Sequence, residues 1–140
     1  MPCDAGWQLR LAKAIEYDGA VDRTFLFVGA LCGALGVGLG AFGAHGLRGR
    51  LTPEMLAVFE TGVRYQMYHA LAILLVAALV DRLDSRLVPI AGWCFSAGIV
   101  IFSGSLYALA VSGVTVLGAI TPIGGVAFLA GWACLIIASW

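Results

Sequence analysis

The chain has 140 residues, of which 61% are hydrophobic and only 11% are charged, and its formal net charge is zero. A soluble domain is about half apolar and about a quarter charged, and a soluble fold of this length would leave too much apolar surface in water. The composition therefore predicts an integral membrane protein. Nucleic-acid binding is excluded because the chain has no basic patch with interleaved aromatic residues.

The first 24 residues are the most polar part of the chain. Trp7, Leu11 and Ile15 recur at helical spacing among charged residues, which indicates a short amphipathic segment. It is either a helix lying on the membrane surface or a loosely ordered tail. Residues 25–44 then carry no charge, and a run of this length crosses a hydrocarbon core of about 30 Å. They are the first predicted span, because the run is too long and too late for a signal peptide.

The second predicted helix has a clear beginning. Thr52 is a good N-cap, Pro53 suits the first helical position, and Glu54 suits the positive end of the helix dipole. The pattern predicts one long helix from residue 53 to 80 that is amphipathic at first and spans the membrane over residues 61–80. Its apolar stripe consists of Leu56, Phe59, Val63, Met67, Ala70 and Leu74.

Two further apolar runs, residues 87–110 and 117–138, complete four predicted spans. The fold class is therefore an all-α, integral membrane four-helix bundle. Residues 25–140 form the membrane domain and residues 1–24 form an N-terminal extension. Both termini then lie on one side of the membrane, here called the near side, which carries Arg10, Lys13, Arg23, Arg82 and Arg86. The opposite, far side carries Arg48, Arg50 and Arg64, and this imbalance favours cytoplasmic termini.

Five glycines mark one face of the first span. They are spaced by four, three, four and three residues, and are Gly29, Gly33, Gly36, Gly40 and Gly43. Small residues let membrane helices approach closely, and lipid supplies no hydrophobic force to join helices. The stripe predicts a tight helix contact, within the chain rather than between subunits because three other helices are at hand.

Polar residues gather toward the far side in all four spans. The candidate polar cluster is His45, Glu60, Thr61, Arg64, Tyr65, Gln66, Tyr68, His69, Ser103, Ser105, Tyr107 and Thr121. The spacing of Glu60, Arg64 and Tyr68 predicts an ion pair that continues into a phenol. Ionisable groups inside a membrane normally face the bundle interior. The cluster is either a polar pocket open to the far side or a hydrogen-bonded clamp between helices, and the clamp is favoured.

Motifs for chemistry are absent from the sequence. Cys3, Cys32, Cys94 and Cys134 form no metal or redox motif and are interpreted as small apolar filler. A haem held by His45 and His69 is disfavoured because the two lie at different depths. No zinc, phosphate-binding or hydrolase motif occurs. We therefore expect no enzyme activity, no cofactor and no metal; a membrane enzyme that uses His69 as acid and base is the least favoured reading.

Four blocks of the sequence resemble one known family. They begin at Gly40, Thr61, Phe102 and Thr121, and read GAFGAHG, TGVRYQMYH, FSGSLY and TPIGG. They are similar, in order and spacing, to the signature blocks of the YgdD-like family, also called domain-of-unknown-function family 423, whose animal relatives are called transmembrane protein 256. The resemblance implies a small multi-pass protein, of the inner membrane in bacteria, and it implies no activity.

Two functions remain open at this level. The first is a non-enzymatic scaffold, accessory subunit or assembly partner in a membrane complex, with other membrane subunits or a second copy as partners besides the lipid bilayer. The alternative is a small transporter or ligand-binding membrane protein that uses the polar cluster. The chain is short for a transporter and has no detectable inverted repeat.

Overall fold

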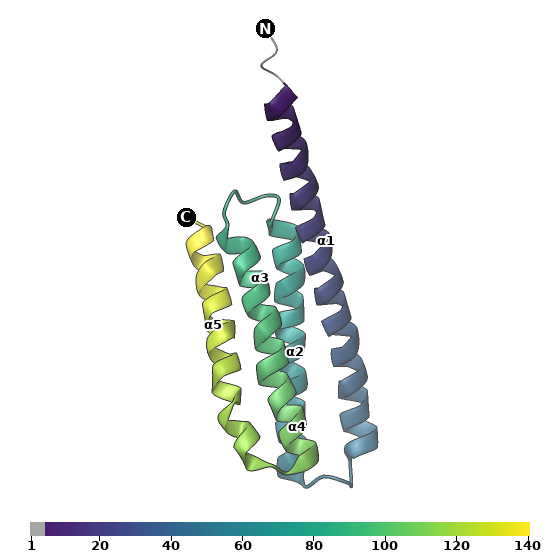
Figure 1. Cartoon of the computed structure of the whole chain (residues 1–140). Coiled ribbons are helices and arrows are strands. Elements are labelled where there is room, and N and C mark those ends of the chain that lie inside the picture. Colours follow the sequence, from purple (N-terminus) through teal and green to yellow (C-terminus); the bar gives the residue numbers. More distant parts are fainter. Residues whose placement is uncertain (1–4) are drawn as a thin grey trace.

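Four membrane-crossing helical segments run side by side in an up-and-down bundle (Figure 1). The structure is a computed structural model that describes the backbone of residues 5–140 and the side chains of residues 22–140. In this part of the chain, four segments are long and apolar enough to cross a membrane: Asp22–Leu47, Pro53–Leu79, Leu87–Ser112 and Thr115–Ala138. The predicted all-α membrane bundle is confirmed.

The first helix, α1, is continuous from Ala5 to Ala41 and passes into a π-helical turn, η1, at Phe42–Leu47. The N-terminal extension is therefore helical from Ala5 onward, and no break separates it from the first span. Its end projects beyond the other helices along the axis of α1 (Figure 1). Of the two alternatives expected for this segment, the helix agrees with the structure, whereas its position on a membrane surface stays a prediction and the side chains of residues 1–21 lie outside the described residues. Residues 1–4 lie outside the described residues.

The second helix, α2, spans Pro53–Leu79 and begins as its sequence predicts. The Thr52 hydroxyl accepts a hydrogen bond from the Met55 amide at 3.3 Å, and Pro53 occupies the first turn, where its missing N–H costs nothing. Because α2 packs against α1, α3 and α4, it is the central helix of the bundle and positions most of the polar residues.

The third segment contains a feature that the sequence does not predict. Helix α3 (Leu87–Gly98) and helix α4 (Gly104–Ser112) are joined by a π-helical turn, η2 (Ile99–Ser103). Such turns insert one extra residue into a helix and occur often at functional positions. The segment ends at Gly113, whose φ of 71° is a left-handed conformation that glycine adopts without strain.

The fourth segment is also interrupted. A short 3₁₀ helix, η3 (Thr115–Ala119), precedes helix α5 (Thr121–Ala138), and Pro122 lies in the first turn of α5. The predicted fourth span, residues 117–138, is therefore not one continuous helix. A proline in a first turn removes no intrahelical hydrogen bond, so Pro122 is compatible with the start of α5.

The predicted glycine stripe forms the contact between α1 and α2. Side-chain atoms placed on Gly29, Gly36, Gly40 and Gly43 would meet Leu74, Met67, Val63 and Phe59 respectively, all members of the predicted α2 stripe. The contact lies within the chain, as expected. Gly33 is the exception, since an added Cβ there would meet no atom within 4 Å. Gly33 thus lies at the edge of the contact rather than in it.

This difference makes a direct test of the α1–α2 contact. In Gly29→Ala the new methyl would lie 3.1 Å from the Ala70 carbonyl oxygen and 2.8 Å from Leu74, so we expect the free energy of unfolding to fall by about 1–2 kcal/mol. In Gly33→Ala the methyl meets open space, and we expect no loss or a gain of about 0.5–1 kcal/mol from helix propensity. Reversible unfolding in mixed detergent micelles measures both, and equal effects would contradict the assigned contact.

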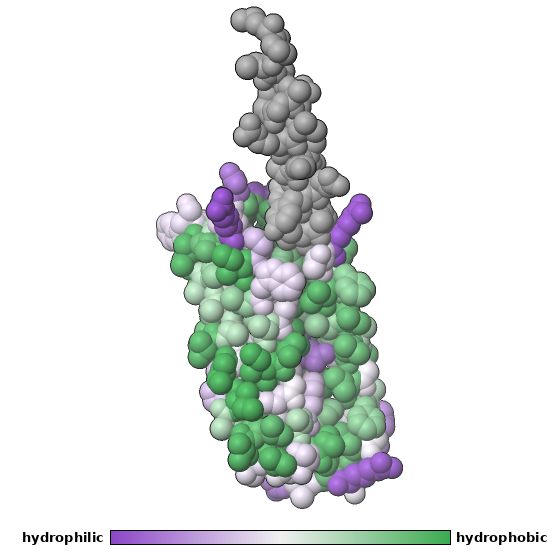
Figure 2. Space-filling model, in the orientation of Figure 1, coloured by the Kyte–Doolittle hydropathy of each residue, from purple (hydrophilic) through white to green (hydrophobic). Residues whose placement is uncertain are grey.

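The largest apolar core lies toward the near side and joins all four segments. Its fully buried members include Phe25, Ile73, Val76, Val88 and Phe95. The outer surface shown in Figure 2 is mostly hydrophobic along the bundle, with hydrophilic residues gathered at the two ends. This pattern is what a bilayer-spanning bundle requires. The polar residues described next therefore lie between an apolar core and the far end.

Candidate functional site

Gln66 joins three helices from the centre of the bundle. Its side chain is 4% exposed. Its amide nitrogen donates to the Cys32 carbonyl oxygen on α1 at 2.8 Å, and its amide oxygen accepts from the Tyr107 hydroxyl on α4 at 2.9 Å. A buried amide in an apolar interior is costly unless it is hydrogen-bonded. Both ends of Gln66 are bonded to other helices, so the residue acts as a clamp.

His69, one turn further along α2, is also buried and engaged on both ring nitrogens. Its Nδ1 lies 2.8 Å from the Tyr65 carbonyl oxygen, and because a carbonyl can only accept, Nδ1 carries the hydrogen. Nε2 is then an acceptor, and the Trp132 indole N–H donates to it at 3.4 Å. The ring stacks on Phe128, with centroids 3.5 Å apart and planes 8° apart. Neither nitrogen is available to a substrate or a haem.

A third polar contact joins α4 to α5. The Ser105 and Thr121 hydroxyls lie 2.8 Å apart, and Ser105 also donates to the Phe102 carbonyl oxygen at 2.9 Å. That carbonyl belongs to the π-helical turn. Ser103 is fully buried within the same turn, and among the residues that the structure describes its hydroxyl has no hydrogen-bond partner. Three separate polar contacts therefore hold the helices together, and they do not merge into one network.

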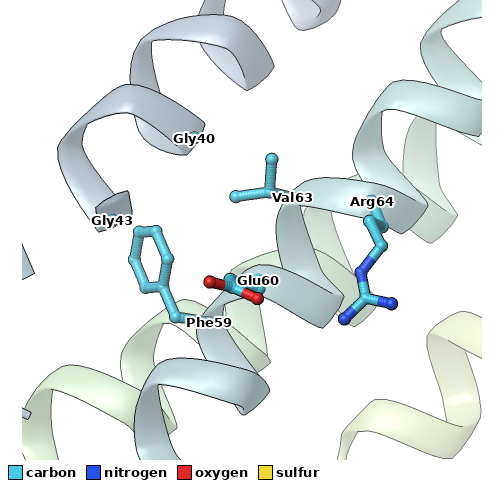
Figure 3. Close-up of a pocket in the computed structure, with 6 residues that line it drawn as sticks. All are labelled: Gly40, Gly43, Phe59, Glu60, Val63 and Arg64. Carbon is cyan, nitrogen blue, oxygen red and sulfur yellow. The ribbon is translucent and has the colours of Figure 1, made fainter. Parts of the chain in front are cut away.

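Five members of the predicted cluster lie on the outside of the bundle instead: His45, Glu60, Arg64, Tyr65 and Tyr68. Thr61, only partly buried, bonds the Ala57 carbonyl of its own helix. The predicted ion pair of Glu60 with Arg64 and its extension to Tyr68 are wrong. Within residues 22–140 neither charged side chain takes part in an ion pair, and Figure 3 shows the two extending in different directions from α2. A helical spacing of four permits such a pair but does not enforce it.

Glu60 and Arg64 line a groove between α1 and α2. The groove has a volume of about 300 Å³, and its other lining residues are Gly40, Gly43, Phe59 and Val63 (Figure 3). Gly40 and Gly43 form its wall on α1, and their lack of side chains lets Val63 and Phe59 of α2 pack directly against this wall. The groove is partly open to the outer surface, so it is a cleft on the side of the bundle and differs from the polar pocket that was the less favoured alternative to the clamp.

Sequence reasoning missed the aromatic surroundings of His69. Phe95 and Phe102 from the third segment and Phe128 and Trp132 from α5 all lie within ring-contact distance of His69 or Tyr65. A signal was present, because Phe128 and Trp132 are four residues apart and Phe95 and Phe102 are seven apart. Each pair therefore shares one face of its helix.

Comparison with known proteins places the chain in a family. A family model described as "Protein of unknown function (DUF423)" matches residues 39–125. The chain belongs to the DUF423 family. The chain is 52% identical over 118 residues, 84% of this chain and 96% of the relative, to the UPF0382 membrane protein YwdK of Bacillus subtilis. It is 48% identical over the same shares to a UPF0382 membrane protein of Staphylococcus haemolyticus. No solved structure matches.

The family assignment confirms the predicted resemblance and describes a membrane protein of unknown function. The matched residues of this DUF423 chain include the Gln66 clamp, His69 and the groove between α1 and α2. The names of these two relatives state no activity. Function must therefore be argued from the surfaces and contacts of the bundle.

Proposed function

We propose that this DUF423 protein is a non-enzymatic subunit or assembly partner of a membrane complex and that it binds its partner through α1. The observation that carries the proposal is the outward face of α1. Ala30, Ala34, Gly38 and Ala41 recur every three or four residues and are all exposed. They lie on the side away from the four glycines that contact α2, so the helix offers a second small-residue face.

Such a face suits a helix of another membrane subunit. Small residues bring two backbones close enough for dispersion contacts and Cα–H···O contacts, which are the main sources of helix association in lipid. An added Cβ at Gly38 would meet no atom within 4 Å, so a partner backbone can approach the helix there. The face is bordered by the exposed Phe27, Leu31 and Leu35, which supply contact area on its flanks.

The contacts of the buried polar residues support a non-enzymatic role. Gln66 and His69 use their polar atoms on other residues of the chain, so the buried imidazole is not free to act as a general base. The hydrogen bonds of Gln66 and His69 also count against a small transporter with a polar path through the bundle. The polar groups along such a path must be able to exchange their hydrogen bonds within the protein for hydrogen bonds to the transported molecule.

We also propose that the protein lies in the inner, or cytoplasmic, membrane of a bacterium with both termini in the cytoplasm. The even number of spans places the termini together. Five basic residues on the near side against three on the far side support this orientation by the positive-inside rule. We therefore expect a tag placed at either terminus to react with a membrane-impermeant reagent only after the membrane has been made permeable.

Site-specific photo-crosslinking in the native membrane tests the partner surface. A photoreactive amino acid at Ala34 is expected to give an adduct with a different membrane polypeptide. The same amino acid at Ala130, an exposed alanine on α5, is the matched control and is expected to react mainly with lipid. Lipid adducts alone at Ala34 would overturn the proposal. An adduct with a second copy of the chain would replace the foreign subunit by self-association.

A further inference from the structure

We propose that the groove between α1 and α2 binds the headgroup of a zwitterionic phospholipid that carries a primary ammonium group. This inference does not rest on the proposed partner surface, which lies on another face of α1. Its basis is a pair of opposite charges, Glu60 and Arg64, that line one groove, are exposed, and form no ion pair within the described residues.

The groove lies at the depth of lipid headgroups. Helix α2 has 27 residues, so it is about 40 Å long, which is about 10 Å more than a hydrocarbon core. If Leu79 marks the near edge of the core, the far edge falls close to Glu60. On α1, Gly43 packs level with Phe59, which places the end of the first span at the same height. Arg64 begins about 6 Å inside the core, a depth from which arginine reaches the interface.

The order of the two charges matches the order of charges in the lipid. In a phosphoethanolamine headgroup the phosphate is nearer the acyl chains and the ammonium is further out. On α2, Arg64 is nearer the membrane centre and Glu60 is one helical turn further out. The guanidinium therefore meets the phosphate, with which it forms charge-assisted hydrogen bonds, and the carboxylate meets the ammonium.

The same pair of charges discriminates between lipid classes. An anionic phosphatidylglycerol headgroup would satisfy Arg64 but leave the Glu60 carboxylate without a cation beside a negative phosphate. A choline headgroup offers a cation without N–H donors, so it cannot hydrogen-bond to the carboxylate. Only a primary ammonium satisfies both charges with hydrogen bonds.

The surface below the groove suits the rest of the lipid. The exposed stripe of α2 continues toward the near side as Leu71 and Leu75, which are 60% and 46% exposed. Spacings of seven residues from Arg64 to Leu71 and four from Leu71 to Leu75 keep these side chains on the stripe that carries Glu60 and Arg64. An acyl chain that leaves the headgroup at Arg64 would lie along these leucines, which makes the polar groove continuous with an apolar path.

Native mass spectrometry of the full chain, released from detergent with added lipids, tests the proposal. Phosphatidylethanolamine, phosphatidylcholine and phosphatidylglycerol with the same acyl chains are the probes. We expect the wild-type protein to retain phosphatidylethanolamine at a concentration severalfold lower than the other two. Arg64→Gln should lose retention by about tenfold, because it removes a charge-assisted contact. Glu60→Gln should keep phosphate binding but lose the preference for phosphatidylethanolamine.

Matched controls are available on the same side of the membrane. Arg48 and Glu54 are exposed and lie outside the groove, so Arg48→Gln and Glu54→Gln make the same charge changes elsewhere and should leave retention unchanged. Equal retention of the three lipids, preference for phosphatidylglycerol, or equal effects of the control variants would overturn the proposal. So would a lipid-free dimer that Arg64→Gln dissociates, because a second copy would then occupy the groove.

Discussion

Replacing Gly124 by alanine is expected to detach α5 from the third segment. The new methyl would lie 2.7 Å from Cβ and 2.8 Å from Cα of Phe102, and closer still to the Phe102 amide nitrogen. Side chains can rotate away from an added group, but here the obstacle is backbone inside the π-helical turn. Relief requires the two helices to separate, which also breaks the bond between Ser105 and Thr121. We expect a loss of about 3 kcal/mol or more in the free energy of unfolding.

The adjacent residue supplies the control for this prediction. At Gly125 an added Cβ would find its nearest neighbours, two ring atoms of Phe102, at 3.9 Å, which is ordinary van der Waals contact. Gly125→Ala should therefore unfold at the same denaturant concentration as the wild type, or at a slightly higher one because alanine favours the helix. Unfolding in mixed micelles measures both variants. Similar stability of the two would show that η2 and α5 are not packed as described.

The close approach at Gly124 illustrates what the sequence could predict and what it could not. Glycines spaced by three and four residues predicted a tight α1–α2 contact, because the helical repeat alone places them on one face. Gly98, Gly124 and Gly131 receive Phe128, Phe102 and Phe95 across the α3–α5 contact, but their spacing does not reveal which aromatic residue each one faces. Which glycine faces which aromatic residue depends on how far each helix is shifted along the bundle axis relative to its neighbour. The π-helical turn changes this axial position for the residues that follow it in the third span.

The membrane-crossing helices themselves were predictable because lipid leaves few alternatives. An apolar run of this length must satisfy its backbone hydrogen bonds internally, so it forms a helix. The apolar spacing allowed a helix before the first span, but it did not predict that this helix joins the span without a break from Ala5 to Ala41. A polar segment can remain helical in water beyond the span, and hydropathy marks only where the lipid ends. The π-helical turns also lack a hydropathy signal.

The sequence identified the residues of the polar cluster but not which of their side chains point into the bundle and which point outward. Gln66 and His69 point inward and are bonded, whereas Arg64 and Tyr68 point outward. All four lie within six residues on one helix, so the rotation of α2 about its own axis decides which of them point inward. That rotation is set by the glycine face of α1, which holds Phe59, Val63 and Met67 against it. The clamp and the groove are therefore consequences of one helix contact.

Replacing His69 by alanine tests whether this residue is part of the structural clamp. The change removes a buried ring that stacks on Phe128 and contacts Phe95, and it leaves the Trp132 indole N–H without its acceptor. Removing a buried aromatic ring costs about 3–5 kcal/mol, and the loss of the hydrogen bond to Trp132, which is 41% exposed, adds about 1 kcal/mol. We expect His69→Ala to unfold at a markedly lower denaturant concentration than the wild type.

His69→Phe separates the packing of the ring from its hydrogen bonds. Phenylalanine can keep the stack on Phe128 but cannot accept from Trp132, so we expect a loss of about 1 kcal/mol. Trp132→Phe removes the same bond from the other side, and the double variant should then cost less than the two single changes added together. If His69→Ala instead left stability unchanged, the ring would not be a clamp. The imidazole would then be a candidate for chemistry, and the proposal would lose the support that the pairing of His69 gives to a non-enzymatic role.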